Sequence, residues 1–170
     1  MKMYPYHRLF VLIIKEKIFA KKNSPTETAI FTFRPGIGDI DLFREMNNGR
    51  YHIFFELARW SIAFRIGLIK FMRKKRIAGF VAGHSVRFHK RVLIWRKTEI
   101  QTKLVGMDKK FWYYQQQLIQ RGLHCATALY RVGLRDKKGI VPTEKAVGAL
   151  GFEDKPFIQE IAETWATWDD

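Results

Sequence analysis

Residues 48–66 read NGRYHIFFELARWSIAFRI, and this stretch decides the fold class. Its apolar residues recur at helical spacing and form one wide stripe, while most of its charged residues fall on the other side. Asn48 suits the N-cap position, because its side-chain oxygen can accept a hydrogen bond from a first-turn amide. Gly67 suits the C-cap. We therefore predict a long amphipathic helix over residues 50–66 and a shorter basic helix over residues 68–76.

The segments before and after this long helix favour β-strands, because several of them alternate apolar and polar residues. We expect strands at residues 29–34, 80–88, 98–105, 111–120 and 123–134. Short turns join the last three, so these neighbours should pair in antiparallel fashion. The predicted order is one strand, a long helix and four further strands. This order predicts an α+β domain, in which one helix packs against one antiparallel sheet.

The composition indicates a globular chain with an anionic partner. Its 170 residues are 47% apolar, enough for the core of one domain. Lys and Arg number 31 against 16 Asp and Glu, a net charge of +15, which favours nucleic acid, an acidic membrane surface or a phosphate-rich ligand. The segment 70–97 is basic and has no acidic residue. The single cysteine, Cys125, excludes an internal disulfide and fits a reducing compartment.

The two ends of the chain differ from its middle. Residues 1–24 form a basic and apolar N-terminal segment, whose apolar run at 9–14 is too short to span a bilayer or to act as a signal peptide. We expect a short helix there, which packs on its own domain or on a second subunit, or lies on an anionic membrane. The domain itself should cover residues 25–151, followed by an acidic tail at 152–170.

The stretch GDIDLFREMNNG at residues 38–49 is the strongest candidate for chemistry. Asp39, Asp41 and Glu45 crowd the start of a helix, where unpaired amides and the helix dipole favour negative charge. The same amides can stabilise an oxyanion, and a carboxylate beside them can attack a carbonyl or activate water. On the residues alone, a plain turn with two aspartates and an N-cap is the favoured interpretation, and catalysis is the alternative.

A composite motif resembles the signature of hotdog-fold acyl-CoA thioesterases: Asp39-x-Asp41-x-x-x-x-Met46-Asn47-Asn48-x-x-Tyr51, followed by Glu56-Leu57-Ala58-Arg59 in the helix. Over residues 28–151 the chain is similar to the 4-hydroxybenzoyl-CoA thioesterase group, and within it to the thioesterase superfamily member six-like branch. The resemblance implies a hotdog fold, with a long central helix wrapped by a curved antiparallel sheet of about five strands. It also implies a homodimer or homotetramer that hydrolyses fatty or aromatic acyl-CoA thioesters, a reaction of lipid metabolism, at the subunit interface.

The resemblance also assigns roles to individual residues. Asp41 matches the family's catalytic carboxylate, a general base or a nucleophile. The other implied catalytic residues are paired asparagines and residues whose backbone amides would face the thioester oxygen: Asn47, Asn48, Gly49, Arg50 and Tyr51. Relatives commonly have Gly-His where this chain has Arg44 and Glu45, so Glu45 becomes a possible second carboxylate. The implied reaction uses no metal and no cofactor, and coenzyme A enters as part of the substrate.

The basic segment 70–97 offers contacts for the phosphates of coenzyme A, because Arg and Lys form charge-assisted hydrogen bonds with phosphate. Arg87, Lys90 and Arg91 are our candidates for substrate binding, and a solvated basic face is the alternative for most of the segment. The aromatic run at residues 111–114 resembles a stacking platform for nucleic acid. However, alternation along a strand sends its side chains to opposite faces, so nucleic acid is not the partner we expect.

No other residue pattern suggests a reaction. The five histidines lack the spacing of a metal site. Cys125 lacks a thiol-protease motif and is expected to be half-buried in a strand, and Ser85 lacks the nucleophile elbow of a serine hydrolase. The resemblance thus leads us to expect an acyl-CoA thioesterase that is cytoplasmic or peripheral to a membrane. The alternative is a non-catalytic hotdog dimer that binds acyl groups or an anionic membrane surface.

Overall fold

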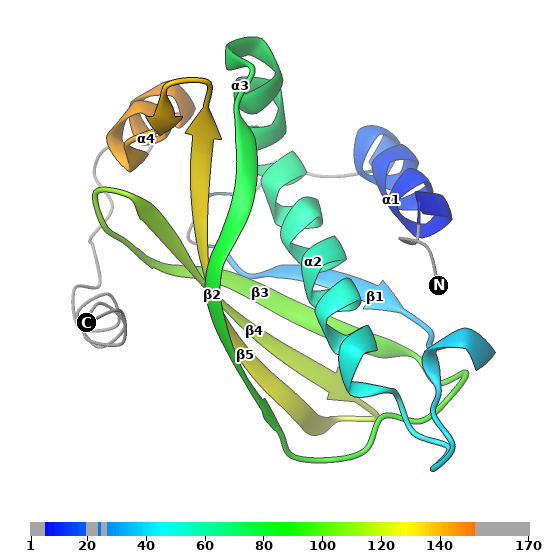
Figure 1. Cartoon of the computed structure of the whole chain (residues 1–170). Helices are drawn as coiled ribbons and strands as arrows, with labels where there is room; N and C mark the ends of the chain where they lie inside the picture. The colour runs from blue at the N-terminus through cyan, green and yellow to red at the C-terminus, as the bar shows by residue number, and fades with distance from the viewer. Residues whose placement is uncertain (1–5, 20–23, 25–26, 152–170) are drawn as a thin grey trace.

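The computed structural model describes residues 6–19, 24 and 27–151 (Figure 1). Its helices are α1 (Tyr6–Phe19), α2 (Asn48–Arg65), α3 (Leu68–Lys75) and α4 (Thr143–Leu150), with a 3-10 helix at Ile37–Asp39. Its strands are β1 (Ala29–Phe33), β2 (Ala78–Phe88), β3 (Thr98–Met107), β4 (Phe111–Gln120), β5 (Leu123–Asp136) and β6 (Gly139–Ile140). The predicted long helix and all the predicted strands are present, several of them a few residues longer than expected.

The strands form one antiparallel sheet in the order β1-β3-β4-β5-β2, with β6 paired to the end of β5. The sheet curls around α2, which crosses its concave face (Figure 1). Irregular pairing between Val81 and Gly83 in β2, and between Leu104 and Gly106 in β3, marks β-bulges, which increase local twist and help a sheet to curl. This architecture confirms the predicted α+β domain, a long central helix wrapped by a curved antiparallel sheet.

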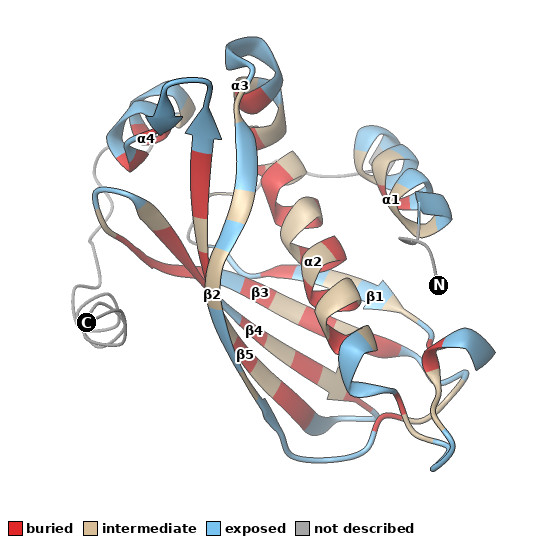
Figure 2. Cartoon of the chain, in the orientation of Figure 1, coloured by how far each residue is buried: buried red, intermediate tan, exposed pale blue. Residues whose placement is uncertain are grey.

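The core lies between α2 and the concave face of the sheet. Buried apolar residues recur at helical spacing along α2, each 0–1% exposed: Phe54, Phe55, Leu57, Ala58 and Ile62. They belong to one cluster with buried residues of the central strands, such as Ile100 and Leu118. Figure 2 shows the corresponding pattern on the strands, where buried residues are interspersed with more exposed ones. The position of α2 is therefore fixed by apolar packing along most of its length.

Helix α1 packs beside α2 and forms part of the same body. Leu12 is 4% exposed, and Glu16 accepts hydrogen bonds from the Ser61 hydroxyl and from the Arg65 guanidinium, the latter at 3.0 Å. The other side of α1 leaves several apolar residues exposed: Tyr6, Phe10, Val11, Ile14 and Ile18. Within the described residues, no helix has both the length and the apolar character needed to cross a bilayer. Packing of the N-terminal helix on its own domain is thus observed.

Two local predictions are wrong in detail. The N-cap of α2 is Asn47 and not Asn48, because Asn48 already belongs to the helix and Asn47 Oδ1 accepts the N–H of Gly49 at 3.0 Å. Cys125, expected to be half-buried, is only 1% exposed, because it belongs to the cluster of buried core residues. The acidic tail at 152–170 lies outside the described residues.

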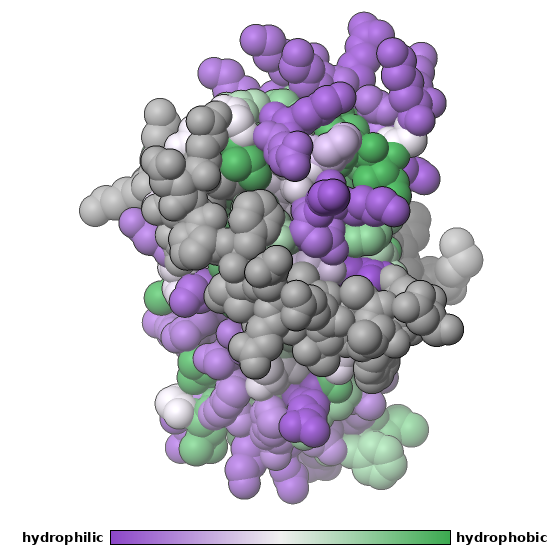
Figure 3. Space-filling view, turned by 90° about the vertical axis from the view of Figure 1, so that its left-hand side faces the viewer, coloured by the Kyte–Doolittle hydropathy of each residue, from purple (hydrophilic) through white to green (hydrophobic). Residues whose placement is uncertain are grey.

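The basic segment 70–97 is not one continuous surface, because β2 runs through its middle and separates its two ends. The end of α3 instead lies beside the β5–β6 turn, because the first residue of β2, Ala78, pairs with Arg135 near the end of β5. Exposed basic residues gather there: Arg73, Lys74, Lys75, Arg76, Arg135, Lys137 and Lys138. Figure 3 shows hydrophilic side chains concentrated at this end of the molecule. Of the segment's other basic residues, Lys70 also lies in α3, whereas the rest lie at the end of β2 or in the loop that follows it: Arg87, Lys90, Arg91, Arg96 and Lys97.

Candidate active site

Asp41 opens a tight loop, the Asp41 loop (residues 40–46), which returns the chain to the start of α2. The Asp41 N–H donates to the Glu45 carbonyl at 2.9 Å, and Ile40 pairs with Met46 in an isolated β-bridge. Asp41 Oδ1 accepts the N–H of Phe43 at 2.8 Å and that of Glu45 at 3.5 Å. Short-range backbone hydrogen bonds therefore hold this half-buried carboxylate in place.

The tip of the Asp41 loop contains a strained residue. Arg44 has a φ of 61°, in the left-handed region that favours glycine. Arg44 and Glu45 stand where the proteins that this chain resembles commonly have Gly-His, so Arg44 takes the place of the glycine. The loop thus keeps a conformation suited to glycine although it carries arginine. Beside it, Leu42 and Phe43 are 98% and 79% exposed, so the tip presents two apolar side chains at the surface.

Asp39, two residues before Asp41, has a structural role. It is 2% exposed, and its carboxylate accepts two hydrogen bonds from the Arg8 guanidinium, at 2.9 and 2.6 Å, and one from the Gly36 N–H at 2.8 Å. Arg50 Nε in the first turn of α2 lies 3.9 Å from Asp39 Oδ1. Asp39 therefore ties α1 to the start of α2, whereas Asp41 forms no ion pair within the part of the chain that the structure describes.

Two amides at the start of α2 are already hydrogen-bonded. The Asn47 side chain accepts the Gly49 N–H at 3.0 Å, and the Asn47 carbonyl accepts the Arg50 N–H at 2.8 Å. Asn48 is exposed at the same turn. A cavity of about 390 Å³ opens beside this turn, lined by Gly38, Ile40, Asn47, Gly49, Arg50 and Ile53. An oxyanion bound here would compete with Asn47 for the Gly49 N–H.

Tyr51 occupies the buried side of the same turn, with 3% of its surface exposed. Its ring meets that of Phe88, at the end of β2, edge to face with 4.8 Å between the centroids. Burial, together with nearby Cys125, Glu45 and Asp41, raises the pKa of Tyr51 to about 12. The Tyr51 phenol is therefore neutral at physiological pH, and the Glu45 and Asp41 carboxylates lie close enough to influence it.

The end of β2 and the loop after it bring the candidate phosphate-binding residues to the start of α2. Arg87 is in β2, while Lys90 and Arg91 are in the following loop, and all three are exposed. The Met46 N–H donates to the Val92 carbonyl at 3.0 Å and so fixes this loop beside the Asp41 loop. The structure thus places all three candidates at the same end of the molecule as Asp41.

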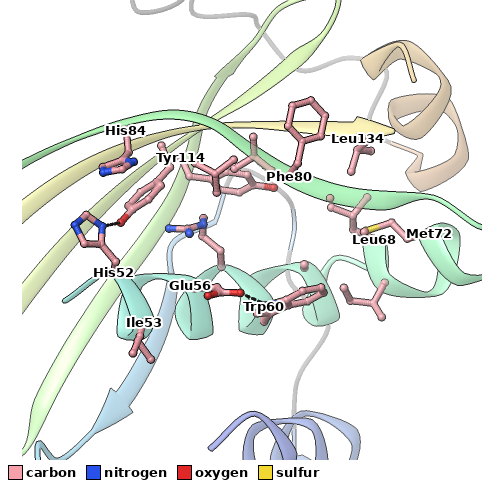
Figure 4. A pocket seen from close by; sticks show the side chains of 17 residues that line it. His52, Ile53, Glu56, Trp60, Leu68, Met72, Phe80, His84, Tyr114 and Leu134 are labelled. Carbon is pink, nitrogen blue, oxygen red and sulfur yellow. Dashed lines mark hydrogen bonds between the residues drawn. The ribbon is translucent and has the colours of Figure 1, made fainter. Parts of the chain in front are cut away.

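A second cavity, of about 430 Å³, lies between α2 and β2 and is named here the α2–β2 cavity (Figure 4). Its apolar end is formed by Leu68, Met72, Phe80 and Leu134. At its polar end, His52 Nδ1 and the Tyr130 hydroxyl share a hydrogen bond of 2.8 Å, and the rings of His52 and His84 are 4.6 Å apart. Burial lowers the pKa of His52, as do nearby His84 and Arg59, so this imidazole is neutral near pH 7.

Arg59 lies against the sheet in the α2–β2 cavity. Its Nη1 donates to Gln116 Oε1 at 2.7 Å, and its guanidinium carbon is 3.6 Å from the centroid of the Tyr130 ring. Gln116 is fully buried, and its amide group donates to the Phe55 carbonyl and to Thr102. Burial lowers the pKa of Arg59, an effect that Tyr130 and the Glu56 carboxylate oppose.

The polar end of the α2–β2 cavity was not predicted from the sequence. His52, Glu56 and Arg59 follow one another at intervals of four and three, which places them on one side of a helix, and this spacing was the available signal. Tyr130 and His84 come from β5 and β2, so no local motif contains them. The structure pairs histidines that are scattered in the sequence, but the described residues include no group of three metal-ligating side chains.

Comparisons with known proteins find several similar chains. A model of the thioesterase-like superfamily matches residues 35–151. Protein THEM6 of Drosophila melanogaster is 31% identical over 113 residues, which cover 66% of this chain and 58% of that protein. The chain therefore spans little more than half the length of this curated relative.

Solved structures are similar in fold. The probable thioesterase YbaW from Escherichia coli superposes with a TM-score of 0.66 at 20% identity, covering 72% of this chain and 96% of its own. The protein SAV2348 from Staphylococcus aureus, solved in complex with CoA, gives a TM-score of 0.67 at 12% identity, covering 80% and 90%. Together with the superfamily match, these likenesses confirm the hotdog fold that the motif around Asp41 led us to expect.

Proposed function

Because the chain belongs to the thioesterase-like superfamily, we propose that it hydrolyses acyl-CoA thioesters to the free acid and coenzyme A. The observation that carries the proposal is the Asp41 carboxylate, held near the start of α2 with Oδ1 bonded to backbone amides. Its other oxygen, Oδ2, accepts no hydrogen bond from the described residues. A carboxylate in this position is available to take a proton from water or to attack a carbonyl.

Two routes are open to Asp41. As a general base, it takes a proton from water while the water oxygen bonds to the thioester carbonyl carbon. The tetrahedral intermediate then breaks its C–S bond, and the coenzyme A thiolate takes up a proton. As a nucleophile, Asp41 attacks the carbon itself, the thiolate leaves, and water hydrolyses the resulting anhydride. In both routes the carbonyl oxygen becomes negative, and the start of α2 favours that charge.

The neighbouring residues position the substrate in this proposal. Asn47 caps α2 and shares the Gly49 N–H with the oxyanion, while the exposed Asn48 contacts the substrate. Tyr51 keeps the first turn packed against Phe88 as a neutral phenol. Glu45, half-buried in the Asp41 loop, is the second carboxylate within reach of the same site.

We assign the phosphates of coenzyme A to the exposed cations beside the Asp41 loop, Arg87, Lys90 and Arg91. Charge-assisted contacts of this kind weaken with salt. The Michaelis constant should therefore rise with ionic strength, and Arg91→Gln should raise it more than kcat falls. Insensitivity to both changes would remove these residues from substrate binding.

A second copy of the chain is part of the proposal. In the described part of the chain, the 11-residue strand β2 pairs on one side only, with β5, and exposes Val81 and Phe88 by 46% and 47%. An unpaired edge of this length is a template for another strand. Light scattering should give twice the chain mass of 20.1 kDa, or four times for a tetramer, and Val81→Lys should favour the monomer. A monomeric parent would contradict this assembly.

Asp41→Asn and Asp41→Ala test the reaction through release of coenzyme A from a panel of acyl-CoA thioesters. Loss of the carboxylate should lower kcat by about 100-fold or more, the usual contribution of a general base. Asp136→Asn is a matched control, since Asp136 also accepts a backbone N–H two residues on, from Lys138 at 2.7 Å, and is exposed in the β5–β6 turn. Equal turnover by the parent and both Asp41 variants would eliminate Asp41 from catalysis.

The second candidate function is a non-catalytic hotdog dimer that binds acyl groups or an anionic membrane. Arg44 and Glu45, which replace the Gly-His pair of relatives, favour it, as do the bonded amides of Gly49 and Arg50. Tight binding of acyl-CoA with no release of coenzyme A would support this function. The exposed apolar side of α1 is the surface we assign to peripheral membrane contact by an otherwise cytoplasmic protein. Sedimentation with anionic vesicles, and its loss in Phe10→Glu, would test that contact.

A further inference from the structure

Helix α1 supplies a side chain that holds the start of the candidate active site in place. It lies outside residues 35–151, which the superfamily model matches, and packs beside α2 (Figure 1). Arg8 of α1 donates two parallel hydrogen bonds to the Asp39 carboxylate, at 2.9 and 2.6 Å. Its guanidinium carbon also lies 4.7 Å from the centroid of the Phe54 ring on α2. Arg8 is therefore fixed both by charge and by packing.

Asp39 connects this contact to the first turn of α2. Its side chain is only 3% exposed and also accepts the Gly36 N–H at 2.8 Å. The backbone carbonyl of Asp39 accepts the N–H of Asn47, the N-cap of α2, at 2.9 Å. Arg50 Nε, in the first turn, lies 3.9 Å from Asp39 Oδ1. Two guanidinium groups from different helices thus share one buried carboxylate beside the residues that we assign to the substrate.

Removing Arg8 should disturb this arrangement at the first turn of α2. A buried carboxylate that loses its hydrogen-bonded cation is strongly destabilised and draws other donors towards it. Among the described residues, Arg50 is the other cation within 4.0 Å of Asp39. A shift of Arg50 towards Asp39 moves the turn that contains Asn48 and Gly49. Misplacement by about 1 Å in a catalytic site can lower the rate about 100-fold.

We propose that Arg8 is a positioning residue of the hydrolytic site, and that α1 sets the turnover rate through it. The inference rests on the proposed function for its effect on the rate, whereas the coupling from α1 to the start of α2 does not. Arg8 acts through Asp39 and contacts neither the substrate nor the reacting atoms. Helix α1 is then a working part of the active site as well as a packing element.

Release of coenzyme A by Arg8→Ala tests the positioning role. Loss of the guanidinium should lower kcat about tenfold and change the Michaelis constant by less than about twofold, because only the geometry of the reacting groups is altered. Arg8→Lys should restore part of kcat, since it keeps the charge but loses the planar fork.

Free guanidinium ion provides a second form of rescue. Millimolar guanidinium chloride, well below the molar concentrations that unfold proteins, should restore part of kcat in Arg8→Ala and leave the parent unchanged. Sodium chloride at the same concentration is the control for ionic strength. Absence of rescue by both lysine and guanidinium would make the loss a packing effect over Phe54, and the proposal would be overturned.

Glu16→Gln is the matched control variant, because it weakens the other ion pair between α1 and α2. Glu16 accepts two hydrogen bonds from Arg65, each of 3.0 Å, at the far end of α2 from Asp41. The variant should lower the melting temperature, as Arg8→Ala does, and leave kcat unchanged below the unfolding transition. Equal losses of kcat in both variants, or an unchanged kcat in Arg8→Ala, would overturn the proposal.

Amide hydrogen exchange measures the coupling independently of activity. In Arg8→Ala, the N–H groups of Asn47, Gly49 and Arg50 should exchange about tenfold faster, while Glu16→Gln leaves them unchanged. Arg8→Lys should show the same pattern in smaller measure and serves where Arg8→Ala does not fold. This pattern in a parent that releases no coenzyme A would support the coupling and contradict the thioesterase function. Unchanged exchange in the Arg8 variants would overturn the coupling itself.

Discussion

The Asp41 loop and the polar end of the α2–β2 cavity both lie against α2, but the chain builds them differently. The backbone N–H groups that hold Asp41 come from residues no more than four positions away. In the cavity, Arg59 binds a residue 57 positions away, and His52 binds one 78 positions away. The loop is thus a local structure, and the cavity cluster depends on the closed sheet. The former is visible in sequence as a motif, and the latter appears only after folding.

Reciprocal variants should separate the two regions, and this is the largest effect we expect. Asp41→Asn should lower kcat by about 100-fold or more, because it removes the carboxylate that acts on the thioester. Arg59→Gln should lower the melting temperature by the same amount in the parent and in Asp41→Asn, because distant sites contribute additively. Coenzyme A release and thermal unfolding of both single variants and of the double variant measure these effects. A loss of stability in the double variant that differs from the sum of the two single losses would show that the two regions are coupled.

Gln116→Leu should destabilise the polar end of the α2–β2 cavity and leave the Asp41 loop unchanged. It removes the acceptor of Arg59 and leaves the Thr102 hydroxyl and the Phe55 carbonyl without their donor in the core. Unsatisfied buried groups of this kind should cost about 2–4 kcal/mol of the free energy of unfolding, measured by denaturant titration. Gln117→Leu, one residue on and half-buried, is the control and should cost much less. Similar losses for both variants would contradict a special role for the Arg59–Gln116 contact.

The same contrast explains how much of the molecule could be predicted from its sequence. The 3.6-residue periodicity of α2 and the alternation of the strands predicted the fold, because those patterns are local. The Asp41 motif predicted the loop, although the hydrogen bond from Gly49 assigns the cap to Asn47. The buried role of Asp39 was not predicted, since Arg8 reaches it from a helix 31 positions away. The sequence also does not show that strand β2 separates the two ends of the basic segment 70–97.

Alkaline pH should affect the two regions through their tyrosines. Burial, Glu45 and Asp41 raise the pKa of Tyr51 to about 12, whereas in the cavity the positive charge of Arg59 limits the rise in the pKa of Tyr130. An unfolded tyrosine ionises near 10, so the contribution of Tyr51 to stability is complete below pH about 10 and is lost as the pH rises to about 12. The loss should be roughly 2–3 kcal/mol.

Unfolding free energies measured across this alkaline range, for the parent and Tyr51→Phe, test the effect. The variant should show a shallower decline, because its ring has no proton to lose. Arg59→Gln should steepen the decline instead, since it removes the cation that favours ionised Tyr130 in the folded state. Identical curves for the parent and Tyr51→Phe would show that Tyr51 does not titrate in this range.

Arg44→Gly should have the smallest effect, and it concerns the Asp41 loop alone. Glycine relieves the strain of a positive φ, which costs other residues about 1–2 kcal/mol, but it also gives the unfolded chain about 0.5–1 kcal/mol more freedom. The net gain should be about 0.5 kcal/mol, a small rise in melting temperature. Arg121→Gly, at a φ of 55° in the β4–β5 turn, is the matched control and should behave alike. A fall in stability for Arg44→Gly alone would mean that the Arg44 side chain itself holds the loop, and the loop would then depend on more than its backbone hydrogen bonds.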